Sequence, residues 1–184
     1  MRNYYDDISW SFLIASPSHT GDFFDESVIL LLEDNEDGAF GIAINKAGGR
    51  KLGEISDEFV STPLEEVEIF DGGPVGRETI SLAVCTYDAD DENGGSFSFG
   101  TSPQNAISEI ENNPDAKVAA FSGYAGWGPK QLQSEISEGE WIVCNADINM
   151  VFDIPPEHLW RELLLKQYPS YQTLPTPTAP PALN

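Results

Sequence analysis

The sequence predicts an α+β fold in a single domain, built on a strongly bent, mixed β-sheet with a few flanking helices. Apolar residues make up 40% of the 184 residues, which is enough to build one core. Short apolar or alternating runs, typical of strands, recur along the whole chain. Helical patterns interrupt these runs irregularly, whereas a parallel α/β sheet requires strands and helices in strict alternation.

The strand patterns begin near the N-terminus. Residues 8–15 alternate polar and apolar side chains and then become wholly apolar, as expected of a strand that enters a core. The runs 27–32 and 40–45 flank a polar turn that ends in Asp37 and Gly38, so they predict a β-hairpin. Further strands are expected at residues 67–70, 79–87, 96–99, 117–121 and 141–144.

Four helices are expected from side-chain spacing and capping signals. The clearest start is Ser102, which can cap a helix with Pro103 at its first position, where a missing N–H group costs nothing. Asp153 is the expected cap of the last helix, which opens at residues 155–157. The other two helices are expected over residues 51–59 and around Leu132 and Ile136.

One globular domain is expected over residues 1–168. Residues 169–184 hold five prolines and no charged residue, so they predict a disordered C-terminal tail. The longest strongly apolar run, residues 28–32, is far shorter than a membrane-spanning helix. The N-terminal residues lack the basic start and apolar stretch of a signal peptide. We therefore expect a cytoplasmic protein with no membrane association.

The charge balance limits the choice of partner. The chain has 9 Lys and Arg against 31 Asp and Glu, so its formal net charge is −22. Binding to a phosphate backbone needs a concentrated positive patch, whereas these basic residues are scattered, so direct nucleic-acid binding is not expected. The acidity has two readings: it gives solubility or adaptation to salt, or it forms a face that meets a basic partner. The sequence leaves the oligomeric state open.

The reactive side chains form no recognisable catalytic or metal-binding set. Cys85 and Cys144 are too few for a disulfide scaffold and each lies in an apolar stretch, so buried, reduced thiols are expected. The two histidines, His19 and His158, have no zinc-site spacing to the cysteines, and His19 is interpreted as an ordinary loop residue. No catalytic residue, cofactor or metal is predicted.

The stretch from Gly123 to Gly128 joins an expected strand to an expected helix, in the layout of a phosphate-binding loop. Such a loop has Lys directly after its last glycine, but Pro129 stands there and removes a backbone donor. The structural interpretation is that the glycines allow Tyr124 and Trp127 to pack against neighbouring backbone. The functional interpretation is an anion site at the N-terminus of the following helix.

Three segments each follow an apolar strand: residues 45–46, 72–74 and 123–128. These segments are expected to converge at one sheet edge. If they do, Lys46 and Lys130 can hold an anion, and Tyr124 and Trp127 can stack on a ring. This predicts a ligand-binding or interaction site. Its candidate residues are Asn45, Lys46, Gly72, Gly73, Pro74, Gly123, Tyr124, Gly126, Trp127, Gly128, Lys130 and Gln131.

Several segments, in their order and spacing, resemble the AlgH (YqgE-type) family of bacterial proteins. The most specific is the Gly-Tyr-Ala-Gly-Trp-Gly-Pro stretch at 123–129 with Gln131-Leu132; the others are residues 12–17, 27–31, 41–46, 72–75 and 152–155 leading to Trp160. The resemblance covers about residues 10–165, nearly all of the expected domain. It departs from the family pattern at Ala47, at Lys130, and in lacking a histidine shortly after residues 72–75.

The resemblance implies an α+β fold with bulged, coiled sheets and a cytoplasmic location. The family has no established catalytic residues and carries the label of a transcriptional regulator, from a role in alginate control. We therefore expect a non-enzymatic regulatory or interaction protein that acts through a protein partner. The alternative is a small anionic-ligand binder or an enzyme that uses the glycine-rich segments.

Overall fold

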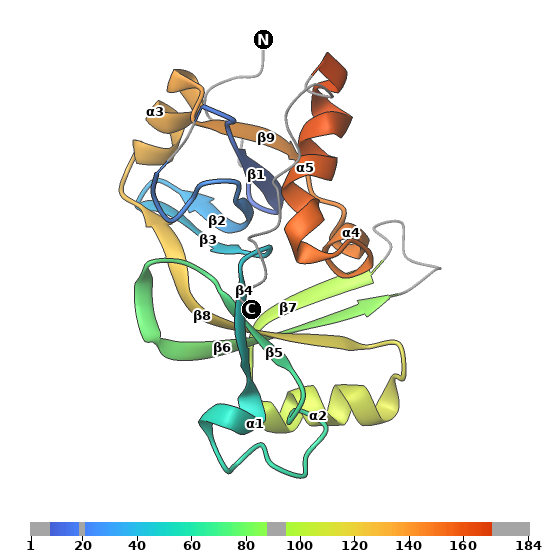
Figure 1. Cartoon of the computed structure of the whole chain (residues 1–184). Coiled ribbons are helices and arrows are strands. Elements are labelled where there is room, and N and C mark those ends of the chain that lie inside the picture. Colours follow the sequence, from blue (N-terminus) through green and yellow to red (C-terminus); the bar gives the residue numbers. More distant parts are fainter. Residues whose placement is uncertain (1–7, 19–20, 88–94, 171–184) are drawn as a thin grey trace, which may run out of the picture.

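Nine strands form one mixed sheet in the computed structural model, which describes residues 8–18, 21–87 and 95–170 (Figure 1). The strands are β1 (Ser11–Ala15), β2 (Val28–Asn35), β3 (Gly38–Ala43), β4 (Ala47–Lys51), β5 (Glu68–Asp71), β6 (Val75–Tyr87), β7 (Gly95–Thr101), β8 (Lys117–Trp127) and β9 (Trp141–Asn145). The main path of the sheet runs in the order β4-β5-β8-β3-β2-β1-β9. The β6–β7 pair joins it through β8.

Strand β8 connects the two halves of the sheet. Its first part pairs with β5 in parallel, with Ala120 opposite Ile69, and with β6 in antiparallel. Its last part pairs with β3, with Ala125 opposite Gly41. Register shifts interrupt four strand pairings: β2–β3, β4–β5, β6–β7 and β6–β8. Such bulges bend and twist the strands, which gives the bulged, mixed sheet of the expected α+β fold.

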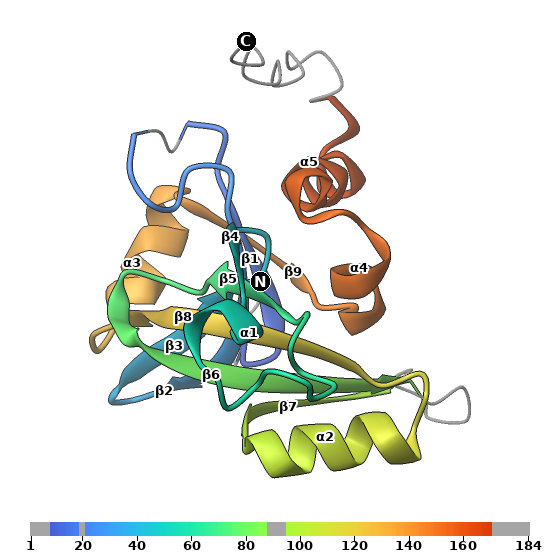
Figure 2. The same cartoon turned by 60° about the horizontal axis from the view of Figure 1, so that its bottom comes forward.

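Five helices flank the described sheet. They are α1 (Leu52–Ile55), α2 (Pro103–Asn112), α3 (Gln131–Glu138), α4 (Ile148–Asp153) and α5 (Pro156–Gln167). Figure 2 shows α3 on one side of the β1–β9 end of the sheet and α4 and α5 on the other, with α2 beside β6 and β7. None of the helices within the described ranges is long and apolar enough to cross a membrane.

Alternating side chains of β1 supply the cores on the two faces of the sheet. Phe12 and Ile14 belong to a cluster that α5 covers with Leu159 and Leu163, and Leu13 faces the opposite cluster under α3. The Trp160 indole N–H donates to the Ala15 carbonyl oxygen at 2.8 Å, which fixes α5 to β1. A third cluster lies under α1 and α2 and includes Leu52, Leu64, Ile69, Leu82, Ala106 and Ala120.

Most of the expected strands and two of the helix starts are confirmed. The β2–β3 hairpin forms at the expected turn, and the Ser102 hydroxyl accepts the Asn105 N–H at 3.2 Å as a helix cap. The expected helix at 51–59 is wrong beyond Ile55, because Leu52 is the only side chain of this turn that is buried. Asp153 ends α4 instead of capping α5, whose N-cap residue is Pro155.

Two elements were not expected from the sequence, and one expected loop is a strand. The unexpected elements are β4 and α4, which are short or poor in apolar pattern. The stretch from Gly123 to Gly128 is expected as a loop that joins a strand to a helix, and this is wrong over most of its length, because β8 continues through Trp127 and pairs with β3 there. Expectations for His19 and for the tail from residue 171 onward lie outside the described residues.

Candidate functional site

The three segments predicted to converge, residues 45–46, 72–74 and 123–128, are brought together by backbone hydrogen bonds, but they meet between β5, β8 and β3 inside the sheet and not at a sheet edge. The Ala43 N–H donates to the Gly72 carbonyl at 2.8 Å, at the end of β3. The Asp71 N–H donates to the Lys46 carbonyl at 2.7 Å, and the Gly72 N–H donates to the Ser122 carbonyl at 2.8 Å. We call the contact between residues 72–73 and 123–125 the glycine junction.

Backbone atoms fill the glycine junction. A Cβ atom at Gly73 would lie 1.9 Å from the Tyr124 carbonyl carbon, and one at Gly123 would lie 2.4 Å from the Gly73 carbonyl oxygen. Gly72 has the same close approach, 2.4 Å to the Gly123 oxygen, and all three glycines are buried. The glycines are therefore required for two backbones to touch, whereas the structural interpretation made from the sequence is that they allow Tyr124 and Trp127 to pack against neighbouring backbone.

Asn45 and Lys46 point to the segment that precedes β2. The Asn45 side chain accepts the Val28 N–H at 2.7 Å and donates to the Glu26 carbonyl at 2.9 Å, and the Lys46 ammonium group donates to the Asp25 carbonyl. Burial lowers the pKa of Lys46 below its ordinary value, and the negative charges of the neighbouring acidic side chains oppose that effect. Both side chains thus hold the chain that leads into β2.

Trp127 is buried and hydrogen bonded within the fold. Its indole N–H donates to Glu135 at 2.7 Å, and the indole of Trp141 donates to the same carboxylate oxygen at 2.8 Å. Gln131 donates to the other oxygen of Glu135 at 2.9 Å and accepts the Gly128 N–H at 3.0 Å. This network fixes the start of α3, and only 7% of Trp127 is exposed, so its ring face is not available for stacking on a ligand.

Tyr124 is the aromatic side chain of the glycine junction that reaches the surface. It is 37% exposed, and its ring centroid lies 5.0 Å from that of Phe40. Gly126 lies against the ring, and Pro74, Gly128 and Lys130 are exposed. Lys130 has a left-handed backbone conformation (φ = 63°) at the start of α3. Together with Gln131, these are the exposed residues among those predicted to bind a ligand.

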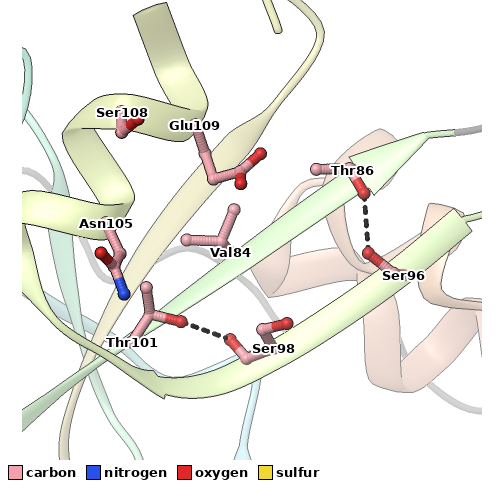
Figure 3. Close-up of a pocket in the computed structure, with 8 residues that line it drawn as sticks. All are labelled: Val84, Thr86, Ser96, Ser98, Thr101, Asn105, Ser108 and Glu109. Carbon is pink, nitrogen blue, oxygen red and sulfur yellow. Dashed lines mark hydrogen bonds between the residues drawn. The ribbon is translucent and has the colours of Figure 1, made fainter. Parts of the chain in front are cut away.

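A groove forms on a different part of the surface, between α2 and the β6–β7 hairpin (Figure 3). It has a volume of about 480 Å³ and is lined by Val84, Thr86, Ser96, Ser98, Thr101, Asn105, Ser108 and Glu109. Figure 3 shows Asn105 and Glu109 of α2 and Val84 of β6 pointing into one space. None of the residues predicted from the sequence to form a site lines this groove.

The groove arises from the way α2 packs. Ala106 is buried and Ile110 is half-buried in the cluster under the helix, so the opposite flank of α2 carries the polar residues that face the groove. On β7 the side chains alternate: Ser96 and Ser98 are exposed on the groove side, whereas Phe97 and Phe99 pack against the core. A polar helix flank therefore lies next to a polar strand face.

The groove presents hydroxyl, amide and carboxylate groups over an apolar floor. Thr86 and Ser96 share a hydrogen bond of 2.7 Å between their hydroxyl groups, and the Thr101 hydroxyl donates to the Ser98 carbonyl at 3.4 Å. Buried Val84 forms the floor, and Glu109 supplies the negative charge. The sequence carried a trace of this site in the Ser-Phe-Ser-Phe alternation, but that alternation predicts only a strand.

Both cysteines are buried and free, as expected. Cys144 borders a smaller cavity of about 290 Å³ between β9 and α5, beside Lys166 and Gln167. Burial raises the pKa of both thiols, and at Cys144 a hydrogen bond from Gln167 and the charge of Lys166 oppose that effect. Because the thiolate is the reactive form, neither cysteine is activated as a nucleophile.

Comparisons with known proteins agree over nearly the whole chain. A family model described as AlgH-like (DUF179) matches residues 12–172. A UPF0301 protein of Streptomyces coelicolor is 31% identical over 179 residues, which is 94% of this chain and 93% of that protein. The UPF0301 protein AlgH of Pseudomonas aeruginosa is 32% identical over 154 residues, covering 79% and 81% of the two chains.

Two solved structures are similar. The solution structure of AlgH from Pseudomonas aeruginosa has a TM-score of 0.67 and 27% sequence identity, and covers 97% of this chain and 100% of that chain. A crystal structure of a protein from Corynebacterium diphtheriae has a TM-score of 0.66 at 24% identity, covering 96% and 92%. The second match shows a shared fold.

Proposed function

The chain belongs to the AlgH-like family, and on this premise we propose that it is a non-enzymatic regulatory protein that acts by binding a basic partner protein. The observation that carries the proposal is the charge of the surface. The formal net charge is −22, and several of the few cations lie against the protein's own oxygen atoms.

In the ion pairs of the described residues, Lys and Arg side chains contact carboxylates of the same chain. One guanidinium nitrogen of Arg77, Nη2, donates to both carboxylate oxygens of Asp71, at 2.7 and 2.8 Å. Lys51 pairs with Glu66, and Lys117 lies 3.4 Å from Asp153. Exposed pairs of this kind contribute little stability, but they neutralise the cations locally. The remaining acidic side chains therefore determine the sign of the surface field.

Exposed carboxylates gather at two turns. Glu33, Glu36 and Asp37 lie at the β2–β3 turn, and Glu54, Asp57 and Glu58 lie on α1 and directly after it; all six are exposed. A surface of one sign raises the rate at which a partner of the opposite sign associates and repels phosphate backbones. A regulator with this surface would act by contacting another protein, without touching DNA itself.

Affinity capture tests this proposal. The full chain is used as bait in a lysate of its source organism, at salt concentrations from about 0.05 to 0.5 M, which span strong to weak screening. We expect one basic protein to be retained in stoichiometric amount at low salt and lost at high salt, and purified partner to bind the chain in a defined ratio by calorimetry. Retention that does not change with salt, or turnover of a metabolite by the purified chain, would contradict the proposal.

The second candidate function is binding of a small anionic ligand, and the convergence of residues 45–46, 72–74 and 123–128 favours it. Its residues would be the accessible ones, Tyr124 and Lys130, with Lys46 close to the junction through its backbone. A thermal-shift screen with nucleotides and phosphorylated metabolites tests this function. A ligand that raises the melting temperature of the chain but not of Lys130→Ala would support it, and no shift with any compound would end it.

A further inference from the structure

We propose that β7 is a docking edge, to which an extended basic segment of the partner protein adds as a further strand. This inference rests on the proposed function and names where the partner binds and what chemistry its segment has. It is carried by three features that lie side by side: an unprotected strand edge, an exposed tryptophan, and the groove with its carboxylate.

The sequence of β7 lacks the usual edge protection, although α4 packs against this strand. Within the described residues β7 pairs only with β6, and β4 and β9 are the other strands with a single neighbour. Natural edge strands are blocked by charges, prolines or short length. β4 carries Arg50 and Lys51, and β9 has five residues, whereas β7 has seven residues with no charge and no proline.

The backbone of β7 has hydrogen-bonding capacity to spare. In the part of the chain that the structure describes, its backbone-to-backbone hydrogen bonds are those of the pairing with β6. One carbonyl, that of Ser98, accepts the Thr101 hydroxyl at 3.4 Å, which is a long hydrogen bond. An added strand would satisfy the outward N–H and C=O groups, and these main-chain bonds supply affinity in β-strand addition.

Trp10 provides an apolar contact on the inner side of β7. Its ring centroid lies 6.2 Å from that of Phe97, in an edge-to-face arrangement, and it is 49% exposed. The backbone of Trp10 has φ = 63°, a conformation that costs free energy for a bulky residue, and its N–H donates to the Leu31 carbonyl at 2.7 Å. The fold thus holds a large aromatic side chain at the surface in a strained position.

The groove provides the contact on the outer side. Glu109 accepts no side-chain hydrogen bond and forms no ion pair within the described residues, and Asn105 lies beside it on α2. Side chains of an added strand alternate between the two faces of the sheet. One set would reach over Ser96 and Ser98 toward Glu109, where a Lys or Arg fits, and the other set would meet Trp10, where an apolar side chain fits.

This alternation of basic and apolar residues favours a partner over a second copy of the chain. Two copies paired through β7 would bring together two molecules of charge −22 each, which repel. A basic segment gains from the same field. The predicted occupant is therefore an extended segment of about six to eight residues in which Lys or Arg alternates with apolar residues, matched to the length of β7.

A defined peptide tests the inference on the isotope-labelled full chain. The probe has ten residues that alternate Lys and Val, with both ends blocked. A first control is the same peptide N-methylated at four successive residues. It keeps its charge but lacks N–H donors on both of its own strand edges, so it cannot pair with β7 there. In a second control peptide, Glu replaces Lys. We expect only the probe to shift the amide resonances of residues 96–100 and to slow their hydrogen exchange by about tenfold or more.

Matched variants locate the side-chain contacts. Glu109→Gln should weaken probe binding about fivefold, the effect of one partly exposed charge pair, whereas Glu111→Gln on the exposed side of the same helix should not. Trp10→Ala should weaken it about tenfold through loss of the aromatic contact. Equal effects of the two Gln variants would overturn the inference, as would equal binding of the N-methylated peptide or a dimer formed through β7 without peptide.

The inference and the proposed function fail in distinguishable ways. If a basic protein is captured from the lysate but protects amides elsewhere, the inference is wrong and the proposed function stands. If the probe protects β7 but no partner is captured, the docking edge stands and the proposed function is wrong.

Discussion

The glycine junction and the groove beside β7 differ in how tightly their atoms are packed. At the junction, Gly73 lies so close to Tyr124 that a single methyl group would overlap the neighbouring backbone. In the groove, hydroxyl groups surround about 480 Å³ of open space. Near the end of β7, a Cβ atom added to Gly100 would have no neighbouring atom within 4 Å. A conspicuous sequence motif therefore marks close packing here, whereas the accessible groove is lined mainly by ordinary Ser and Thr residues.

The difference shows what a glycine-rich motif can mean. Glycines approach a ligand or another backbone for the same reason, the absence of a side chain, so the spacing alone does not distinguish the two. The distinction comes from what lies opposite. The atom opposite Gly123 is the carbonyl oxygen of Gly73. The atom opposite Gly38 is the carbonyl oxygen of Trp127, which would lie 2.3 Å from a Cβ atom at that position.

The largest effect is expected from Gly73→Ala. The new methyl group would lie 1.9 Å from a backbone carbon, so two segments must separate, and we expect the free energy of unfolding to fall by about 4 kcal/mol or more. Gly100→Ala is the matched control: its φ of 76° is unfavourable for Ala but its surroundings are open, so about 1–2 kcal/mol is expected. Urea denaturation measures both, and equal losses would contradict the comparison.

The next effect tests whether the residues around the glycine junction are structural. Glu135→Ala removes the carboxylate that accepts two indole N–H groups, so we expect a loss of about 3 kcal/mol. Glu138→Ala on the same helix removes only an exposed contact with Ser134 and should cost less than about 0.5 kcal/mol. If the two variants unfold at the same urea concentration, the indole–carboxylate network has no structural role.

The fold class and most strands could be predicted because binary patterning determines them. The β2–β3 hairpin and the Ser102 cap follow from local signals. Residues 122–127 could not be identified as strand, since glycines and aromatics together are typical of a loop, and only the pairing of Ala125 with Gly41 makes them extended. Local sequence does not contain that long-range contact.

The candidate site was predicted only in part. The convergence of Lys46, Gly72 and Gly123 follows from placing each segment after an apolar strand, and the structure brings them together. The groove depends on which flank of α2 turns toward β7, which is set by tertiary packing of Ala106 and Ile110. Polar residues at helical spacing are common on any solvated face, so no pattern singled out Glu109.

A smaller effect on the free energy of unfolding is expected when the pH is raised, and it comes from the two buried thiols. Burial raises the pKa of Cys85 and Cys144 in the folded state, so the folded protein holds its thiol protons more tightly than the unfolded chain. This contribution to stability is complete below the ordinary thiol pKa and is lost as pH rises through the higher folded pKa, from about pH 9 upward.

Comparison with the double variant Cys85→Ala, Cys144→Ala isolates this effect from other groups. The unfolding free energies of the two proteins should converge as the pH is raised from 8 to 10.5, since only the parent chain carries the thiols. Lys46, whose pKa is lowered, contributes equally to both and cancels. A constant difference across this range would contradict the account of buried, protonated thiols.

The smallest effect is expected in the groove itself. Ser98→Ala removes an exposed hydroxyl on β7 that anchors nothing in the core, so the free energy of unfolding should change by less than about 0.5 kcal/mol. Denaturation monitored by tryptophan fluorescence checks this value. A loss comparable to that of Glu135→Ala would mean that the groove, like the glycine junction, is a structural feature.

Photo-cross-linking tests the proposed docking edge most directly. A benzoylphenylalanine is introduced in cells either at Ser98, in the groove beside β7, or at Tyr124, at the exposed surface of the glycine junction. The account predicts a covalent adduct with one basic protein from position 98 and none from position 124. An adduct from position 124 alone would contradict it and would assign partner binding to the glycine junction.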